Sequence, residues 1–313
     1  MNAKKRKELE KQGYRFVGNH SAIKVCEYCR DSLRNIDQCY KEEFYGIKSH
    51  RCCQMTPSLD FCNLRCQWCW RDIAHTKPEW HGPVDKPKDI VDGCLEQQAK
   101  YLQGFKGRKG TDLTKFREAE MPNQFAISLA GEPTFYPKLP ELIREIKSRD
   151  FTAFLVTNGT IPTMLNKILR KPEAHPTNLY ITLEAPDKTT FRQCCRPLIP
   201  VDTAWNNIKK SLRIMSRFPS RTTLRLTVTK GLNMKSPEKY AELIKIAEPD
   251  GVEVKAYMWV GYSRKRLDLK SMPTHDDILD FAKQLNSHLP GYKITKQKAR
   301  SRVVLLENQK GKV

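Results

Sequence analysis

Three cysteines lie close together in the first quarter of the chain, and their spacing is that of a metal site. Cys62, Cys66 and Cys69 are separated by three residues and then by two. A closed structural zinc site or a fully ligated iron-sulfur cluster takes four protein ligands. A 4Fe-4S cluster held by only three cysteines keeps one iron open to a small molecule. The spacing therefore favours a cluster with an open iron over a zinc site or unrelated structural thiols.

The part of the chain before these cysteines contains five more: Cys26, Cys29, Cys39, Cys52 and Cys53. It has few periodic apolar runs, so we expect it to need a metal or the main domain for order. Three of its thiols are candidates for a second cluster. Adjacent cysteines point in different directions, so only one of Cys52 and Cys53 should reach a shared metal, but spacing does not choose between Cys26 and Cys29. A zinc site formed by Cys26, Cys29, His50 and Cys52 is the alternative.

Composition narrows the class of protein. With 56 Lys and Arg against 35 Asp and Glu, the net charge is +21, which favours a polyanionic partner, with nucleic acid as the leading candidate. The alternative is a basic surface without a specific partner. The first seven residues are basic but lead into Glu8 and Glu10, which predicts a charged helix start rather than a targeting signal. Eleven cysteines without a signal segment or a long apolar run indicate a reducing, cytoplasmic setting without membrane association.

Strands and helices alternate from residue 54 onward. Apolar runs predict strands at residues 54–59, 125–129, 151–156, 179–183, 223–229, 251–260 and 302–306. Between them, periodic apolar patterns predict helices, including one over residues 91–105. Ser236 is expected to cap a helix that begins at Pro237, and Thr274 to form a capping box with Asp277.

This alternation predicts the fold class and the domain organisation. Continuous apolar strands separated by helices are typical of a parallel sheet covered by helices. About six strand-helix units fit an α/β partial (β/α)6 barrel. We therefore predict a barrel domain over residues 54–313 with a basic C-terminal segment, preceded by a cysteine-rich extension over residues 1–53. Cys94, Cys194 and Cys195 are expected to be structural thiols.

Polar residues follow three of the predicted strands. Gly131 and Glu132 come after the second strand, Asn158 after the third and Glu184 after the fourth. The carboxyl ends of parallel strands share one face and build the site in such folds. Glycine is needed where a ligand meets the backbone closely, and a carboxylate can accept hydrogen bonds from hydroxyls. The alternatives are an ordinary turn and a solvated carboxylate.

The three-cysteine loop, with the aromatic Trp68 just before its last cysteine, resembles the signature of the radical S-adenosylmethionine (SAM) superfamily. The resemblance implies that Cys62, Cys66 and Cys69 hold a 4Fe-4S cluster whose open iron binds SAM. Gly131 and Glu132 resemble the glycine-glutamate motif that receives the methionyl amino group, although Ala130 replaces the commoner first glycine. Asn158 and Glu184 are then expected to face SAM or the substrate.

Together with the earlier cysteines and the basic charge, these motifs resemble the 4-demethylwyosine synthases of wybutosine biosynthesis over nearly the whole chain. That family implies two 4Fe-4S clusters in a partial triose-isomerase-type barrel. Matched in order, the second cluster's ligands are Cys26, Cys39 and Cys52, which leaves Cys29 and Cys53 aside. Multidomain relatives carry a flavodoxin-like domain, which is missing here, so an external one-electron donor (flavodoxin or ferredoxin) is expected.

The implied reaction condenses pyruvate with N1-methylguanosine beside the anticodon of tRNA(Phe), through a SAM-derived radical at the N-methyl group. Lys41 and Lys48, near the second set of cysteines, are the candidates for an imine with pyruvate. We expect a monomer, with a basic rim for the tRNA supplied by Lys230, Arg264, Lys265, Arg266 and residues 296–302. The alternatives are another two-cluster radical SAM enzyme, such as a peptide maturase, and a zinc-dependent nucleic-acid-binding protein.

Overall fold

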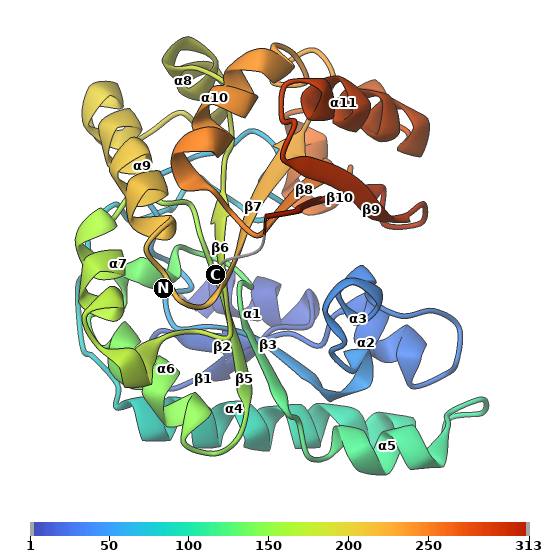
Figure 1. Cartoon of the computed structure of the whole chain (residues 1–313). Coiled ribbons are helices and arrows are strands. Elements are labelled where there is room, and N and C mark those ends of the chain that lie inside the picture. Colours follow the sequence, from blue (N-terminus) through green and yellow to red (C-terminus); the bar gives the residue numbers. More distant parts are fainter. Residues whose placement is uncertain (1–2, 311–313) are drawn as a thin grey trace. The chain divides into compact units, whose positions relative to one another are not determined.

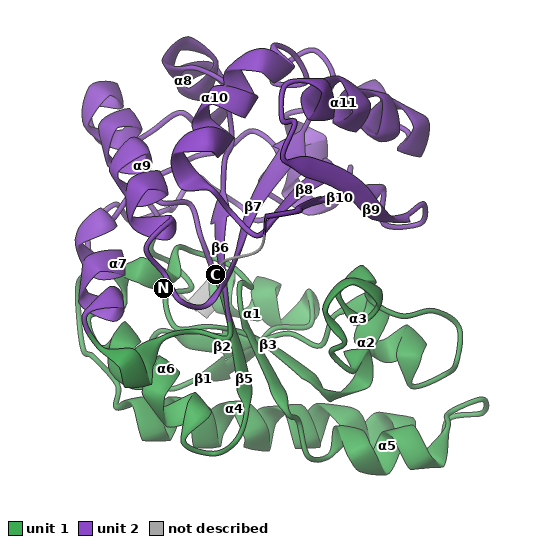
Figure 2. Ribbon diagram, viewed as in Figure 1, with its two compact units in different colours: residues 1–61, 80–155, 171–177 green, residues 62–79, 156–170, 178–313 purple. Residues whose placement is uncertain are grey.

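The structure, a computed structural model, describes residues 3–310 (Figure 1). The basic start predicted for the chain is helix α1 (Ala3–Lys11), whereas Met1 and Asn2 lie outside the described residues. The chain forms two compact units, each built from separate stretches (Figure 2). Unit 1 contains the described residues up to Phe61 together with residues 80–155 and 171–177. Unit 2 contains residues 62–79 and 156–170 and the described residues from 178 onward.

Unit 1 is built on a sheet that begins antiparallel and continues parallel. Strands β1 and β2 form a hairpin, β2 pairs antiparallel with β3, and the pairs β3/β4 and β4/β5 are parallel. Parallel pairing places the carboxyl ends of β3, β4 and β5 at one edge. The strands are β1 (Arg15–Val17), β2 (Ser21–Ile23), β3 (Cys52–Thr56), β4 (Gln124–Ile127) and β5 (Thr152–Thr157), whose last two residues belong to unit 2.

Helices cover this sheet and hold the cysteine-rich lead-in. The long helix α4 packs against β1, β2 and β3 and against α6 (Figure 1). Leu33 and Cys29 of the lead-in are fully buried against Leu102, Phe105 and Phe116. Packing on the main domain therefore orders this segment. The helices are α2 (Glu27–Ser32), α3 (Tyr40–Tyr45), η1 (Ser49–Arg51), α4 (Pro87–Leu102), η2 (Gln103–Phe105), α5 (Leu113–Ala119), η3 (Pro133–Phe135), α6 (Leu139–Lys147) and η4 (Pro172–Ala174).

Unit 2 combines three parallel strands with an antiparallel pair. Strands β6 (Asn178–Thr182), β7 (Arg221–Val228) and β8 (Gly251–Ala256) are parallel, and β10 (Val303–Asn308) joins β8 to β9 (Tyr292–Lys298) in antiparallel fashion. Helix α9 packs against α7, α8 and α10, while α11 lies on β8, β9 and β10 (Figure 1). The helices are α7 (Pro162–Leu169), α8 (Lys188–Cys195), α9 (Val201–Met215), α10 (Pro237–Ala247), η5 (Gly261–Lys265), η6 (Leu269–Ser271) and α11 (His275–Ser287).

Most predicted elements are present, with shifted ends. The predicted 91–105 helix is α4 followed by η2, and Thr274 and Asp277 form the expected capping box of α11. The predicted strand at 251–260 was too long, because β8 ends at Ala256. Ser236 was wrongly predicted as a capping side chain: it has φ +52° and makes no side-chain cap hydrogen bond, so Pro237 alone marks the start of α10.

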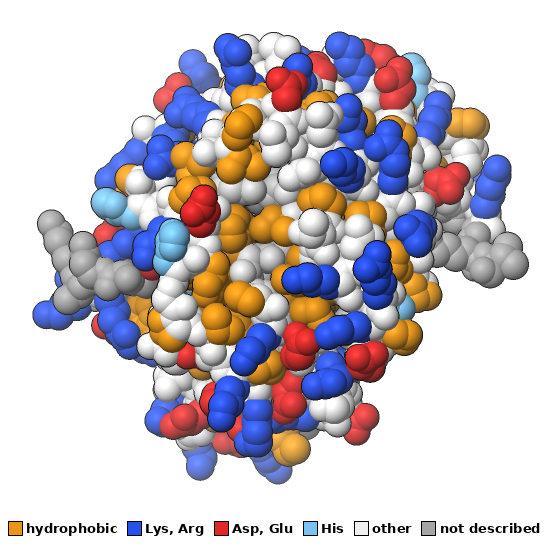
Figure 3. Space-filling view, turned by 90° about the vertical axis from the view of Figure 1, so that its left-hand side faces the viewer, with side chains coloured by type: hydrophobic (Ala, Val, Ile, Leu, Met, Phe, Trp, Pro, Cys, Tyr) orange, Lys and Arg blue, Asp and Glu red, His pale blue; other side chains and the backbone are white. Residues whose placement is uncertain are grey.

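Basic side chains are spread widely over the face drawn in Figure 3, as the net charge of +21 requires. None of the helices within residues 3–310 combines the length and the apolar character of a membrane span.

Candidate active site

The three predicted cluster cysteines lie in the cysteine loop, residues 62–70, which belongs to unit 2 and contains no helix or strand. The amide of Cys69 donates to the carbonyl of Cys66 at 3.0 Å, so these two thiols belong to one tight turn. Cys62 is buried, and its amide donates to the Lys77 carbonyl at 2.9 Å. Cys66 and Cys69 are partly exposed. The loop thus contains three thiols, two of them partly exposed.

Asn63 fixes the start of the cysteine loop. Its backbone carbonyl accepts from the amide of Leu198 at 2.8 Å, and its side-chain oxygen accepts from the Thr160 hydroxyl at 2.8 Å. Asn158, predicted to face SAM, donates to the Cys62 sulfur at 3.7 Å. Its own oxygen accepts from the amide of Thr160 at 3.0 Å. Asn158 is therefore oriented toward a thiol of the loop by the turn that follows β5.

The end of helix α8 holds the middle of the cysteine loop. The amides of Arg65 and Gln67 donate to the carbonyls of Cys195 and Cys194 at 2.8 and 2.9 Å. The Cys195 thiol donates to the sulfur of Cys66, which favours the Cys66 thiolate, but burial raises the pKa of Cys66 overall. We predicted Cys195 as a structural thiol. It is fully buried, but it also contacts a predicted ligand.

Glu184 lies near the same thiols. It is 7% exposed, and its carbonyl accepts from the Asn233 side chain at 2.9 Å. Its charge adds to burial in raising the pKa of Cys194 to about 12. Glu184 is thus a buried carboxylate next to the cysteine loop, not the solvated carboxylate of the alternative interpretation.

Segment 259–266, after β8, also contacts the cysteine loop. Arg266 donates through Nε to the Gln67 carbonyl at 3.0 Å and through a terminal nitrogen to the Cys69 carbonyl. We predicted Arg266 for the tRNA rim, but its guanidinium faces the cysteine loop. Arg264 and Lys265 are exposed, and their cationic groups lie 4.7 Å from the ring centres of Trp259 and Tyr262.

In unit 1, Gly131 and Glu132 form a tight turn after β4. The amide of Glu132 donates to the Phe61 carbonyl at 2.7 Å, and the Ser58 hydroxyl donates to the Glu132 carbonyl at 2.8 Å. The Glu132 carboxylate accepts from the hydroxyl of Thr134 at 2.6 Å, so it caps the turn that follows. Gly131 has φ +72°, and an added Cβ would lie 1.9 Å from the Ser58 carbonyl oxygen. Glycine is therefore needed at position 131 because the backbone of this turn lies directly against the backbone at Ser58.

The cysteines that follow from the family resemblance, Cys26, Cys39 and Cys52, lie near one another in unit 1. Burial and the neighbouring Cys39 raise the pKa of Cys26 to about 11. Burial raises the pKa of Cys52 well above its usual range, with contributions from Cys26 and Cys39, while the charge of Lys41 acts in the opposite direction. All three are partly exposed. Metal binding would displace the protons that these surroundings retain.

The thiols of Cys29 and Cys53 have other hydrogen-bond partners, although Cys29 lies within electrostatic range of Cys26 and Cys52. The Cys29 thiol donates to the His50 carbonyl at 3.6 Å, whereas Cys26 caps α2 and accepts from the Cys29 amide at 3.4 Å. Cys53 is fully buried beside Cys94, which raises its pKa through a hydrogen bond between the thiols. Side chains alternate along a strand, so Cys52 and Cys53 point to opposite faces of β3.

The alternative zinc site lacks a free histidine. His50 is buried, with Nδ1 3.3 Å from the Ser32 hydroxyl and Nε2 2.6 Å from the Glu118 carboxylate. Both ring nitrogens are therefore engaged, and a zinc ligand needs one of them. Within residues 3–310, no three His, Cys, Asp or Glu side chains are grouped to hold a single metal ion.

The two candidate lysines have different surroundings. Lys41 is 9% exposed, and its Nζ lies 5.2 Å from the centre of the Phe154 ring. The side chain of Lys48 is 53% exposed and forms an ion pair with Glu118 at 3.6 Å. Desolvation favours a neutral, nucleophilic amine, and exposure does not. Lys41 is the better candidate on these grounds.

Sequence reasoning missed a buried histidine that fixes the segment after β3. His20 Nδ1 lies 2.6 Å from the Pro57 carbonyl, and Nε2 accepts from the Asp85 amide at 3.0 Å. The Leu59 amide donates to the His20 carbonyl at 3.0 Å, and the His20 ring packs edge-on against Trp80. A lone histidine between two short strands gives no sequence signal for this role.

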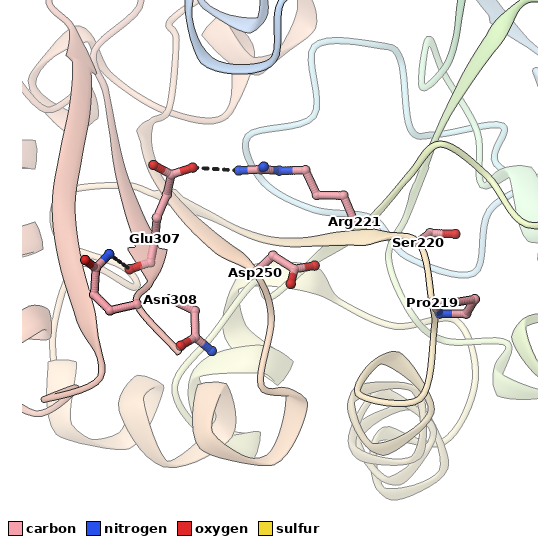
Figure 4. A pocket seen from close by; sticks show the side chains of 7 residues that line it. Pro219, Ser220, Arg221, Asp250, Glu307 and Asn308 are labelled. Carbon is pink, nitrogen blue, oxygen red and sulfur yellow. Dashed lines mark hydrogen bonds and ion pairs between the residues drawn. The ribbon is translucent and has the colours of Figure 1, made fainter. Parts of the chain in front are cut away.

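A pocket of unit 2 lies at the amino end of β7, whereas the polar residues predicted for the site follow the carboxyl ends of strands (Figure 4). It is bounded by the start of β7 and the end of β10, with Arg221 paired to Glu307 at 2.7 Å. Asp250 accepts from the amide of Thr222 at 2.7 Å. The charged side chains Arg221, Glu307 and Asp250 of this pocket thus have partners within the protein. None of the residues that line the pocket was predicted as a site residue.

Comparisons with known proteins agree with this geometry. The radical SAM superfamily matches residues 56–244, and the family described as wyosine base formation matches residues 246–308. The tRNA 4-demethylwyosine synthase of Pyrococcus abyssi is 47% identical over 299 residues, covering 95% of this chain and 86% of the relative. The synthase of Methanocaldococcus jannaschii is 38% identical, covering 98% and 96%. The rice synthase is 37% identical over 96% of this chain, which spans only 45% of that protein.

Solved structures lead to the same family. A structure of TYW1 with a lysine-pyruvate adduct has a TM-score of 0.88 at 35% identity and covers 100% of this chain and 98% of its own. A crystal structure of archaeal TYW1 has a TM-score of 0.80 at 32% identity with the same coverage. The predicted α/β radical SAM fold is therefore confirmed, and with it the use of SAM and a 4Fe-4S cluster. The chain belongs to the tRNA 4-demethylwyosine synthase family of radical SAM enzymes.

Proposed function

We propose that the chain condenses pyruvate with N1-methylguanosine next to the anticodon of tRNA(Phe) and so forms 4-demethylwyosine in the wybutosine pathway. The observation that carries this proposal is 47% identity to a named synthase across 95% of the chain. The wyosine base formation match at residues 246–308 separates the chain from radical SAM enzymes that act on peptides. A lysine-pyruvate adduct in a similar structure supports pyruvate as the second substrate.

The cysteine loop would hold the radical-forming cluster through Cys62, Cys66 and Cys69. Its donor set suits this group, because three thiols lie in one short loop, and the hydrogen bond from Cys195 favours a thiolate at Cys66 against the opposing effect of burial. When bound, the cluster and SAM supply a radical that removes hydrogen from the N-methyl group. The protein's own part is to hold the loop backbone and to keep the thiols together.

Four residues are proposed to contact SAM: Gly131, Glu132, Asn158 and Glu184. The left-handed Gly131 lets this turn lie against the carbonyls of Ser58 and Phe61, and the carbonyl of Glu132 has a second lone pair for a donor. The buried Glu184 lies near Cys66, where a carboxylate could accept from ribose hydroxyls or a substrate amine. Asn158 donates to the Cys62 sulfur, so it would orient that ligand as well.

A second 4Fe-4S cluster is proposed at Cys26, Cys39 and Cys52. The mutual influence of these thiols on their pKa values indicates that they lie within electrostatic range of one another. Each thiolate of a cluster binds a different iron, so the ligands need not converge on a point. Cys29 also lies within electrostatic range of Cys26 and Cys52, but its thiol donates to the His50 carbonyl.

Lys41 is the proposed imine lysine. It is buried, and its charge acts on Cys52, so pyruvate bound there would lie near the second set of thiols. Lys48 is the weaker candidate because its exposed ammonium is paired with Glu118.

The remaining proposals concern partners and setting. The net charge of +21 suits the phosphates of a tRNA, and Arg264 and Lys265 are exposed cations over aromatic rings. We also propose an external flavodoxin or ferredoxin as electron donor, a monomeric state, a cytoplasmic setting and a cluster-bearing extension at residues 1–53 before a barrel domain at residues 54–313.

The test is a reconstituted reaction. Protein reconstituted anaerobically with iron and sulfide is incubated with pyruvate, SAM, a chemical reductant and tRNA(Phe) that contains N1-methylguanosine. The tRNA is then digested, and its nucleosides are separated and identified by mass spectrometry. We expect the tricyclic base and 5'-deoxyadenosine, both lost in Cys66→Ala. The proposal fails if loaded protein cleaves SAM but leaves the methylguanosine unchanged with pyruvate present.

A further inference from the structure

The backbone of the cysteine loop is held by a segment far away in the sequence. Three carbonyls of the loop accept hydrogen bonds from this segment: those of Gln67 and Cys69 from the Arg266 guanidinium, and that of Trp70 from the Tyr262 amide at 2.8 Å. Gly261 permits this approach, because a Cβ there would lie 2.3 Å from the Trp70 carbonyl oxygen. Residues 261–266 thus pack directly against the backbone of the cysteine loop.

Arg266 differs from the other cations of its segment. Arg264 and Lys265 are exposed and lie over aromatic rings, whereas Arg266 is partly buried. Among the described residues, its hydrogen bonds go to two carbonyls of the cysteine loop and to no carboxylate. A guanidinium presents its donors in a rigid planar fork, so it fixes the spacing of both acceptors. Its positive charge is therefore directed at the loop; Asp72 lies within electrostatic range of it.

We propose that Arg266 is a positioning residue of the radical-forming cluster, which holds the turn between Cys66 and Cys69 and stabilises the reduced cluster through its charge. The inference rests on the proposed ligation by these cysteines. Hydrogen bonding and charge around a cluster set its reduction potential. A three-thiolate cluster becomes more negative when it gains an electron, so a nearby cation favours the reduced state.

This role links the two family regions of the chain. The cysteine loop lies in the radical SAM region, residues 56–244, and Arg266 lies in the wyosine base formation region, residues 246–308. The wyosine region thus contributes to cluster geometry in addition to any contact with the tRNA.

The test compares Arg266→Met, which removes charge and fork, with Arg266→Lys, which keeps the charge. Arg264→Met, a change of an exposed cation in the same segment, is the matched control. The first readout is amide hydrogen exchange in cluster-free protein. We expect exchange at Gln67 and Cys69 to rise about tenfold in both Arg266 variants, whose loop lacks the fork, and to stay unchanged in the control.

The second readout is the reduction equilibrium of the reconstituted cluster, followed by electron paramagnetic resonance. We expect Arg266→Met to shift it about tenfold toward the oxidised state, about 59 mV for one electron, and Arg266→Lys to restore most of the shift. Unchanged exchange and an unchanged potential in Arg266→Met would overturn the proposal. If Arg266→Met does not fold, exchange in Arg266→Lys equal to that of the native protein would overturn the positioning role. Failure of the wild-type chain to bind a cluster would contradict the proposed function, while the exchange result would still test the contact with the loop.

Discussion

Replacement of Gly131 by alanine isolates the close backbone approach that we assign to the SAM loop. Gly131 has φ +72°, in the left-handed region, and its added Cβ would lie 1.9 Å from the Ser58 carbonyl oxygen and 2.9 Å from that of Phe61. Both obstacles are backbone atoms, which cannot rotate away. Gly159→Ala is the matched control: its φ is also +72°, but its nearest neighbour is a side-chain atom, the Cγ2 methyl of Ile181, at 3.1 Å.

The expected magnitudes follow from these contacts. Left-handed backbone costs a non-glycine residue about 1–2 kcal/mol, which applies to both variants. Forced overlap in a packed site adds about 1–3 kcal/mol, which applies to Gly131→Ala. Since 1 kcal/mol corresponds to about 2–4 °C in a chain of a few hundred residues, we expect Gly131→Ala to melt roughly 2–12 °C below Gly159→Ala.

Thermal unfolding followed by circular dichroism measures this difference, and equilibrium dialysis with SAM tests the ligand role. We expect at least a tenfold loss of SAM affinity in reconstituted Gly131→Ala, because the turn must move to relieve the overlap. Equal melting temperatures of the two variants would refute the steric reasoning. A destabilised Gly131→Ala with native SAM affinity would remove the turn from the SAM site.

Two further predictions concern unit 1. Borohydride reduction in the presence of pyruvate should attach one reduced pyruvate to the native protein and to Lys48→Arg but not to Lys41→Arg, since only Lys41 is buried. Peptide mass spectrometry locates the adduct. Labelling of Lys41→Arg at native yield would reject Lys41 as the imine lysine. Burial lowers the pKa of His20 below its ordinary 6.5, so the unfolded state binds more protons than the folded state as the solution is acidified. The contribution of the neutral His20 to the free energy of unfolding is therefore complete above pH 6.5 and declines as the pH falls below 6.5. Urea unfolding at pH 7.5 and 5.5 should therefore show a smaller acid-induced loss in His20→Gln than in the native protein, and equal losses would show that His20 does not cause the dependence.

Local patterns predicted the elements well where burial decides them. The apolar runs that became β4, β5 and β6 were found to within a residue or two, because strands buried on both faces are continuously apolar. The capping box of Thr274 was also predictable, since both partners lie within four residues. Ser236 shows the limit: its left-handed backbone comes from the preceding turn, which the capping pattern does not report.

The sequence predicted the candidate cluster ligands but not the residues from distant segments that hold them in place. Three cysteines in eight residues are a local signal, whereas Arg266 reaches the cysteine loop across 197 positions of sequence. A basic residue among basic neighbours was therefore assigned to the tRNA rim. Likewise, no pattern reports that both nitrogens of His50 are engaged, or that the Cys195 thiol faces Cys66. Contacts between distant segments decided these roles.

The most direct test of the account is the iron and sulfide content after anaerobic reconstitution. The native chain is compared with a Cys26→Ala, Cys39→Ala, Cys52→Ala variant, and Cys53→Ala serves as the control because that buried thiol faces Cys94. We expect about eight irons per native chain and per control and about four in the triple variant, as two 4Fe-4S clusters require. About four irons in every protein would contradict the second cluster, and zinc without iron would contradict the radical mechanism itself.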